Sequence, residues 1–186
     1  MGKKSKGFHE LLRLQKMSPK LPVAKSKAQG IKVISPQETE LSSSSNFEEQ
    51  EGRIGLIVGV DEEGEVTAVN DETLAIYQNY LQTHLEQPCQ VTGSEDFQWE
   101  EYYIIGPGSK QEHDRLRKTK PSYLDTYELL EFKNVIDGWN GLLVSVKRVS
   151  DRKKFVLPLS DLKAIDKQSK NAQLLEDYSV WFVNWR

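Results

Sequence analysis

The densest group of chemically useful side chains is acidic and lies near the middle of the chain. Four carboxylates occur within seven residues, at Glu95, Asp96, Glu100 and Glu101. Carboxylates this close repel one another, and a bound cation or a basic partner relieves the repulsion. Calcium prefers several carboxylate and carbonyl oxygens and tolerates irregular geometry, so a calcium site is one interpretation. A solvated acidic loop is the other, and the residues themselves leave both open.

No familiar catalytic grouping is indicated by the sequence. Cys89 follows His84 by five residues without a third, orienting group, which is more typical of a buried inert thiol than of a nucleophile. The three histidines are too scattered to form a zinc site with one cysteine. The turn-like Gly106–Gly108 lacks the Lys-Ser/Thr that follows a phosphate-binding loop. We therefore expect a protein that is not an enzyme.

The acidic cluster lies between a predicted helix and a set of predicted strands. Asn70 or Asp71 can cap a helix whose apolar residues recur every three or four positions before Pro88. The segment Lys110–Tyr123 is charged and predicts a surface insertion or a short helix. Short apolar runs separated by turn residues predict a small antiparallel sheet or barrel, with strands at Cys89–Thr92, Trp99–Ile105, Tyr127–Phe132, Leu142–Val149 and Phe155–Leu157.

Two further elements are predicted at the ends of this folded part. Leu56, Val58 and Val60 alternate before the turn residues Asp61–Gly64, which predicts a β-hairpin over residues 53–69. Near the C terminus, one helical stripe of aromatic and apolar residues predicts a helix packed on the sheet; it consists of Leu174, Leu175, Tyr178, Trp181, Phe182 and Trp185. The folded domain is expected to span residues 70–186.

The N-terminal part of the chain is strongly basic and poor in apolar residues. Residues 1–32 contain nine Lys/Arg and one acid, whereas residues 33–109 contain sixteen acids and one base. We expect residues 1–50 to be a disordered tail and Ser-rich linker. Within it, Phe8, Leu11 and Leu12 share one helical face beside Arg13. One interpretation is a short docking helix at residues 8–14 for a protein partner, and the other is a disordered tail with incidental leucines. Nucleic acid is not expected as a partner, because the acidic block would compete with it for the tail.

Cysteine content and hydropathy indicate the compartment. A single cysteine excludes an intramolecular disulfide, which fits a reducing environment. No apolar run approaches the roughly 20 residues needed to cross a bilayer, and the N terminus lacks the pattern of a secretory signal. A cytoplasmic location without membrane contact is therefore expected.

Three features carry a resemblance to a known family. They are the helix with Leu74, Tyr77 and Leu81, the segment Leu157–Leu162 with the sequence Leu-Pro-Leu-Ser-Asp-Leu, and the terminal helix through Trp181. In their order and spacing, residues 72–186 resemble the bacterial CcbP-type calcium-binding family. An insertion near residues 94–122 and the basic tail depart from the family pattern.

The resemblance implies an α+β fold, with a small antiparallel SH3-like sheet or barrel, an N-terminal helix and a packed C-terminal helix. It also implies calcium as the bound ion, with Asp161 and Asp166 as the first candidate ligands and Glu176 and Asp177 next. The expected function is a calcium-binding or calcium-responsive cytoplasmic module. The alternative is an interaction subunit whose basic tail docks onto a larger protein or ribonucleoprotein assembly.

Overall fold

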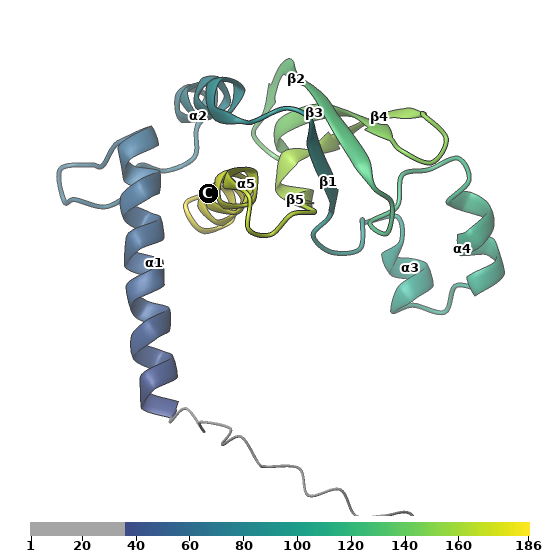
Figure 1. The fold of residues 1–186 in the computed structure, drawn as a ribbon, viewed down its shortest axis with the longest axis horizontal. Helices are drawn as coiled ribbons and strands as arrows, with labels where there is room; N and C mark the ends of the chain where they lie inside the picture. Colours follow the sequence, from purple (N-terminus) through teal and green to yellow (C-terminus); the bar gives the residue numbers. More distant parts are fainter. Residues whose placement is uncertain (1–35) are drawn as a thin grey trace, which may run out of the picture. The chain divides into compact units, whose positions relative to one another are not determined.

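The computed structural model describes residues 36–186, of which residues 37–186 form one compact unit (Figure 1). The helices are α1 (Pro36–Val58), α2 (Asp71–His84), α3 (Glu101–Ile104), α4 (Lys110–Leu116) and α5 (Lys170–Asn184). The strands are β1 (Cys89–Gly93), β2 (Tyr127–Asp137), β3 (Gly141–Arg148), β4 (Lys154–Pro158) and β5 (Leu162–Ala164), with a 3-10 helix η2 (Leu159–Asp161) before β5. No helix in this part of the chain has both the length and the apolar character to span a membrane.

The five strands form one antiparallel sheet in the order β4-β3-β2-β1-β5. Strands β2, β3 and β4 pair in succession, whereas β5 returns after η2 to pair with β1, with Val91 opposite Ala164. This return places the first and last strands side by side, which is the SH3-like arrangement. The predicted α+β fold with an SH3-like sheet is confirmed.

Aromatic residues of α5 join the sheet, α2 and the chain before α2 into one core. The Tyr178 hydroxyl accepts a hydrogen bond from the Leu142 backbone N–H at 2.8 Å. The Trp181 indole donates to the Thr67 carbonyl at 3.0 Å and stacks on Tyr77 at a centroid distance of 4.9 Å. The predicted C-terminal helix and its packing on the sheet are thus confirmed.

Helix α2 starts where the sequence indicated. The Asn70 side chain accepts hydrogen bonds from the backbone N–H groups of Glu72 and Thr73, and the Thr73 hydroxyl accepts one from the Asn70 N–H. This reciprocal capping satisfies donors that the first turn of a helix leaves unpaired. The helix therefore begins at a position that local chemistry determines.

The predicted hairpin over residues 53–69 is wrong in its first arm, which belongs to α1. Ile54 and Val58 are buried one helical turn apart, whereas Leu56 is 90% exposed, so burial follows the helical period and not the alternation. Of the hairpin, a single bridge between Val60 and Val66 remains. Residues 36–50, predicted as part of the tail and linker, are likewise helical, and the compact unit begins well ahead of Asn70.

The excursion between β1 and β2 contains α3 and α4. The strand predicted at Trp99–Ile105 is wrong, because this segment turns into α3. The Trp99 indole donates to the Pro121 carbonyl at 2.7 Å, which holds the segment against the later part of the excursion. The short helix predicted within Lys110–Tyr123 is confirmed as α4, and Figure 1 shows both helices beside the sheet.

Candidate functional site

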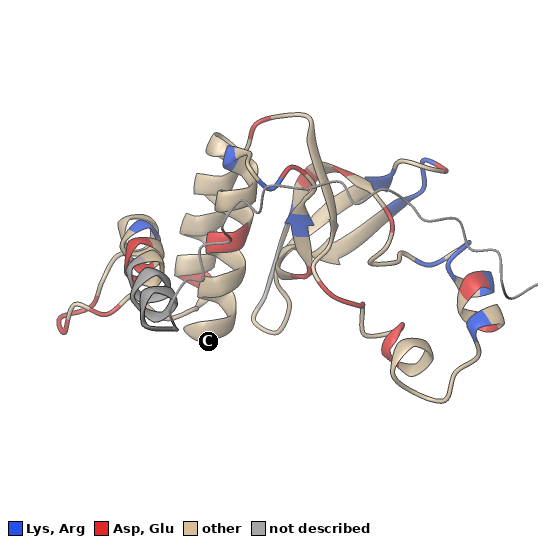
Figure 2. Cartoon of the chain, turned by 60° about the horizontal axis from the view of Figure 1, so that its bottom comes forward, with Lys and Arg blue, Asp and Glu red and all other residues tan. Residues whose placement is uncertain are grey.

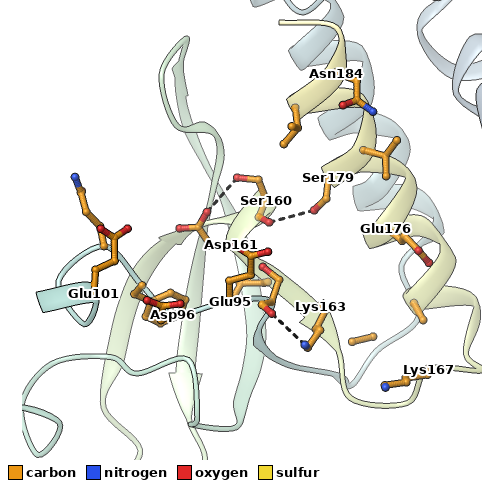
Figure 3. Close-up of a pocket in the computed structure, with 18 residues that line it drawn as sticks. Glu95, Asp96, Glu101, Ser160, Asp161, Lys163, Lys167, Glu176, Ser179 and Asn184 are labelled. Carbon is orange, nitrogen blue, oxygen red and sulfur yellow. Dashed lines mark hydrogen bonds between the residues drawn. The ribbon is translucent and has the colours of Figure 1, made fainter. Parts of the chain in front are cut away.

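A groove of about 950 Å³ lies between three segments of the compact unit. One wall is the chain from Ser94 to Gln98 together with Glu101, the second is α5, and residues of η2 and β5 lie between them (Figure 3). Five carboxylates line the groove, from Glu95, Asp96, Glu101, Asp161 and Glu176. Five of the eight predicted ligand residues therefore come together, although they are spread over 82 sequence positions from Glu95 to Glu176.

Close backbone packing holds the first wall against η2. Gly93 ends β1 with no room for a side chain, since a Cβ atom there would lie 2.5 Å from Cβ of Tyr123. The next residue, Ser94, donates its backbone N–H to the Asp161 carbonyl at 2.8 Å. Glu95 and Asp96 follow directly, so this contact sets them beside Asp161 in the groove.

Asp161 is half-buried where it lines the groove. The Ser160 hydroxyl lies 3.4 Å from its Oδ1, and the Ser160 carbonyl accepts a hydrogen bond from the Ser179 hydroxyl at 3.2 Å, which ties η2 to α5. Burial raises the pKa of the Asp161 carboxyl above its ordinary value, and the hydrogen bond from Ser160 opposes this effect. A cation in the groove would favour the ionised form of Asp161.

Two lysines also line the groove and partly neutralise its negative charge. The Lys163 ammonium donates to the Ser94 carbonyl at 3.1 Å, and Lys167 lies near the start of α5. Within residues 36–186, no three Asp, Glu, His or Cys side chains converge closely enough to enclose a metal ion. The groove therefore supplies hard oxygen ligands from three segments but no preformed cage.

Glu100 was predicted as a ligand but lies outside the groove with its carboxylate fully buried. Its Oε1 lies 2.8 Å from Nε2 of His113 and accepts a 2.6 Å hydrogen bond from the Ser122 hydroxyl. Its Oε2 accepts from the Tyr123 N–H at 2.9 Å. Through these contacts, Glu100 holds together the segment between β1 and β2 that contains α3 and α4.

Asp177 is also buried, on the side of α5 that faces α1. The Arg53 guanidinium donates to both of its carboxylate oxygens at 2.8 Å, and the Gln50 amide donates to Oδ1 at 2.9 Å. The hydrogen bond to Asp177 is the main cause that raises the pKa of Arg53. Asp177 therefore joins two helices and does not face the groove.

Asp166, which the family resemblance implied as a first candidate ligand together with Asp161, lies in the turn before α5. Its Oδ1 accepts from the Gln168 N–H at 3.0 Å, and its carbonyl accepts from the Ser169 hydroxyl at 2.7 Å. It lines a second, smaller cavity of about 360 Å³ together with Asn171. The structure thus separates Asp166 from Asp161.

Sequence reasoning missed the apolar part of the groove wall. Val180 and Val183 line the groove from α5, three positions apart, outside the buried stripe that predicted the helix. Their helical spacing is the signal that could have indicated a second apolar face. The proposed docking residues Phe8, Leu11, Leu12 and Arg13 lie outside the described residues.

Residues 109–182 match the model of the CcbP family, which is described as calcium binding. These residues, called the CcbP-type segment below, resemble that family. The CcbP-type segment contains Asp161, Asp166, Glu176 and Asp177, whereas the acidic cluster from Glu95 to Glu101 precedes it. The resemblance to this family is therefore confirmed, over a shorter range than residues 72–186, and calcium is the ion of that family.

Two solved structures are similar to this chain. One, a calcium binding protein in the calcium-binding form, has 20% sequence identity and a TM-score of 0.44, over 73% of this chain and 90% of the other. The other, the crystal structure of Anabaena CcbP, has 21% identity and a TM-score of 0.45, over 72% and 89%. A comparison with curated proteins gives no match.

Proposed function

We propose that this chain is a non-enzymatic calcium-binding protein and that the ion binds in the groove lined by its carboxylates. The observation that carries the proposal is the meeting of five carboxylates from three separate segments in one groove. Calcium takes six to eight oxygen ligands and accepts carboxylates, carbonyls and water in irregular geometry. The donor set of the groove fits these requirements, and the matched family model adds independent support.

The proposed ligands differ in how firmly the fold holds their side chains before an ion binds. Asp161 is half-buried at the end of η2, which the hydrogen bond from Ser179 to Ser160 ties to α5. In contrast, Glu95, Glu101 and Glu176 are exposed and can turn toward an ion. Ordering such side chains on binding costs conformational entropy. Since no three ligands converge beforehand, we expect modest affinity, with water completing the coordination shell.

The environments of the candidate nucleophile and base support a role without catalysis. Cys89 is buried, and burial is the main cause that raises its thiol pKa, so little reactive thiolate forms at neutral pH. The imidazole of His84 stacks on Tyr80, and that of His113 contacts the buried Glu100. The free cysteine also fits the reducing cytoplasm, which is the location that we propose.

Calorimetric titration of the full chain with calcium, and separately with magnesium, tests the proposal. We expect calcium to bind with measurable heat and to raise the melting temperature, and Asp161→Asn or the pair Glu95→Gln and Asp96→Asn to weaken binding by about tenfold. Asp166→Asn is the matched control, because it removes an equivalent carboxylate outside the groove. The proposal fails if millimolar calcium gives neither heat nor a thermal shift, or if Asp166→Asn weakens binding as much as Asp161→Asn.

A further inference from the structure

The groove is larger and more apolar than a site for a single ion requires. Its volume of about 950 Å³ is at the upper end of the range for sites that hold organic ligands. Val183 is 69% exposed on the α5 wall, and Val180 is partly buried beside it. Phe97 and Leu162 line the groove with their side chains almost wholly buried. Calcium binds oxygen ligands and gains nothing from apolar surface, so this surface indicates a different occupant.

The charge of the groove indicates what that occupant carries. Five carboxylates outnumber the two lysines, and one lysine, Lys163, is engaged with the Ser94 carbonyl. The carboxylates lie on both walls, with Glu95, Asp96 and Glu101 on one and Glu176 on the other. An occupant with apolar groups along one face and ammonium or guanidinium groups beside them would complement both properties.

We propose that this groove binds a basic amphipathic peptide segment of a partner protein, and that calcium and the peptide exclude one another. The apolar face of the segment covers Val180 and Val183, and its lysine or arginine side chains pair with the carboxylates on the two walls. The exclusion rests on the proposed calcium site, because both ligands use the same carboxylates. By linkage, calcium lowers peptide affinity by the factor by which the peptide lowers calcium affinity.

The test uses a fluorescein-labelled peptide of lysine and leucine, with the leucines at helical spacing, and the full-length protein. Fluorescence anisotropy reports binding. We expect the triple variant Glu95→Gln, Asp96→Asn, Glu101→Gln to weaken binding by about tenfold, and Val183→Ser by about threefold. Saturating calcium should release the peptide, and magnesium at equal ionic strength should release less.

Matched controls separate the groove from general surface charge. The triple variant Glu62→Gln, Glu63→Gln, Glu65→Gln removes three carboxylates from an exposed turn, and Val149→Ser alters an exposed valine after β3. Both should bind the peptide as the unmodified protein does. A peptide with glutamate in place of lysine should not bind. Melting temperatures of all variants establish that each one is folded.

The outcomes distinguish the two proposals from each other. Equal weakening by the two triple variants, or equal binding of the glutamate peptide, overturns the peptide site. Calcium that binds by calorimetry without releasing the peptide overturns the exclusion and leaves calcium binding intact. Peptide binding that depends on the groove carboxylates, in a protein that calorimetry shows not to bind calcium, supports the peptide site while the proposed function fails.

Discussion

At the scale of single residues, neighbours in the sequence have opposite roles. Glu100 is buried against His113 and Ser122, whereas Glu101 lines the groove. Glu176 lines the groove, whereas the adjacent Asp177 is paired with Arg53. Carboxylates that already accept several short hydrogen bonds cannot turn to an ion without leaving their donors unpaired. The candidate ligands are therefore the carboxylates that do not already accept several short hydrogen bonds from the protein.

Asp161 should make the stability of the protein depend on pH. Because burial raises its pKa above the ordinary value of 3.8, the folded state holds the proton more tightly than the unfolded state does. Stability should therefore fall as pH rises from that value through the raised pKa. Asp161→Asn lacks this dependence, so without calcium it should melt higher than the unmodified protein at neutral pH.

Melting temperatures measured across acidic and neutral pH, in chelator and then in calcium, check this expectation. Calcium should raise the melting temperature of the unmodified protein at neutral pH by more than it raises that of Asp161→Asn, because the variant binds calcium more weakly. Parallel pH profiles for the two proteins in chelator would contradict the role assigned to burial.

At the scale of elements, contacts between α1 and α5 extend the core beyond the CcbP-type segment. Asp177 is 3% exposed and receives three hydrogen bonds from Gln50 and Arg53 of α1. The rings of Phe47 and Trp185 stack at a centroid distance of 6.5 Å near the same interface. Helix α1 is therefore attached to α5, the helix that forms one wall of the groove.

Arg53→Ala should destabilise the protein by about 2 kcal/mol, because it leaves a buried carboxylate with only the Gln50 amide as a side-chain donor. This loss of unfolding free energy is smaller than that expected for a fully buried ion pair, because the Arg53 side chain is 37% exposed. Urea unfolding measures the change, and Arg115→Ala, at a side chain that is 72% exposed, is the control. In combination with Asp177→Asn the loss should be less than additive; strict additivity would mean that the two groups do not interact.

At the scale of the whole molecule, charge is separated along the sequence. Residues 33–109 carry most of the net negative charge, whereas bases predominate slightly from residue 110 onward. In the fold, acidic residues lie on the segment that leads into α3, and basic residues gather around the β3–β4 turn (Figure 2). The groove takes its acids from both sequence blocks, so its charge does not follow from either block alone.

Removal of residues 1–35 should leave the melting temperature and the heat of calcium binding nearly unchanged, since the compact unit begins at Gln37. Removal of residues 1–58 is the informative comparison, because it deletes α1 and leaves Asp177 without Arg53 and Gln50. Scanning calorimetry should show a lower melting temperature for the second deletion only. A large loss of stability in the first would place essential contacts ahead of α1.

What the sequence by itself determined is local or periodic. Asn70 predicts the start of α2 because its cap acts on residues two and three positions away, and the aromatic stripe predicts α5 because burial repeats with the helical period. The alternation of Leu56, Val58 and Val60 gave a wrong prediction of a β-strand. Ile54 and Val58 also have the spacing of a helix, and packing buries these two residues in a helix.

Only the tertiary structure decided which carboxylates form the candidate site. The partner of Asp177 lies 124 positions away at Arg53, and that of Glu100 lies 13 positions away at His113, so no local pattern shows that these acids are already engaged. The same folding brings Glu95 beside Asp161 through the contact between Ser94 and η2. The sequence determines where the charges are, but the availability of each charge depends on partners that only the folded chain brings together.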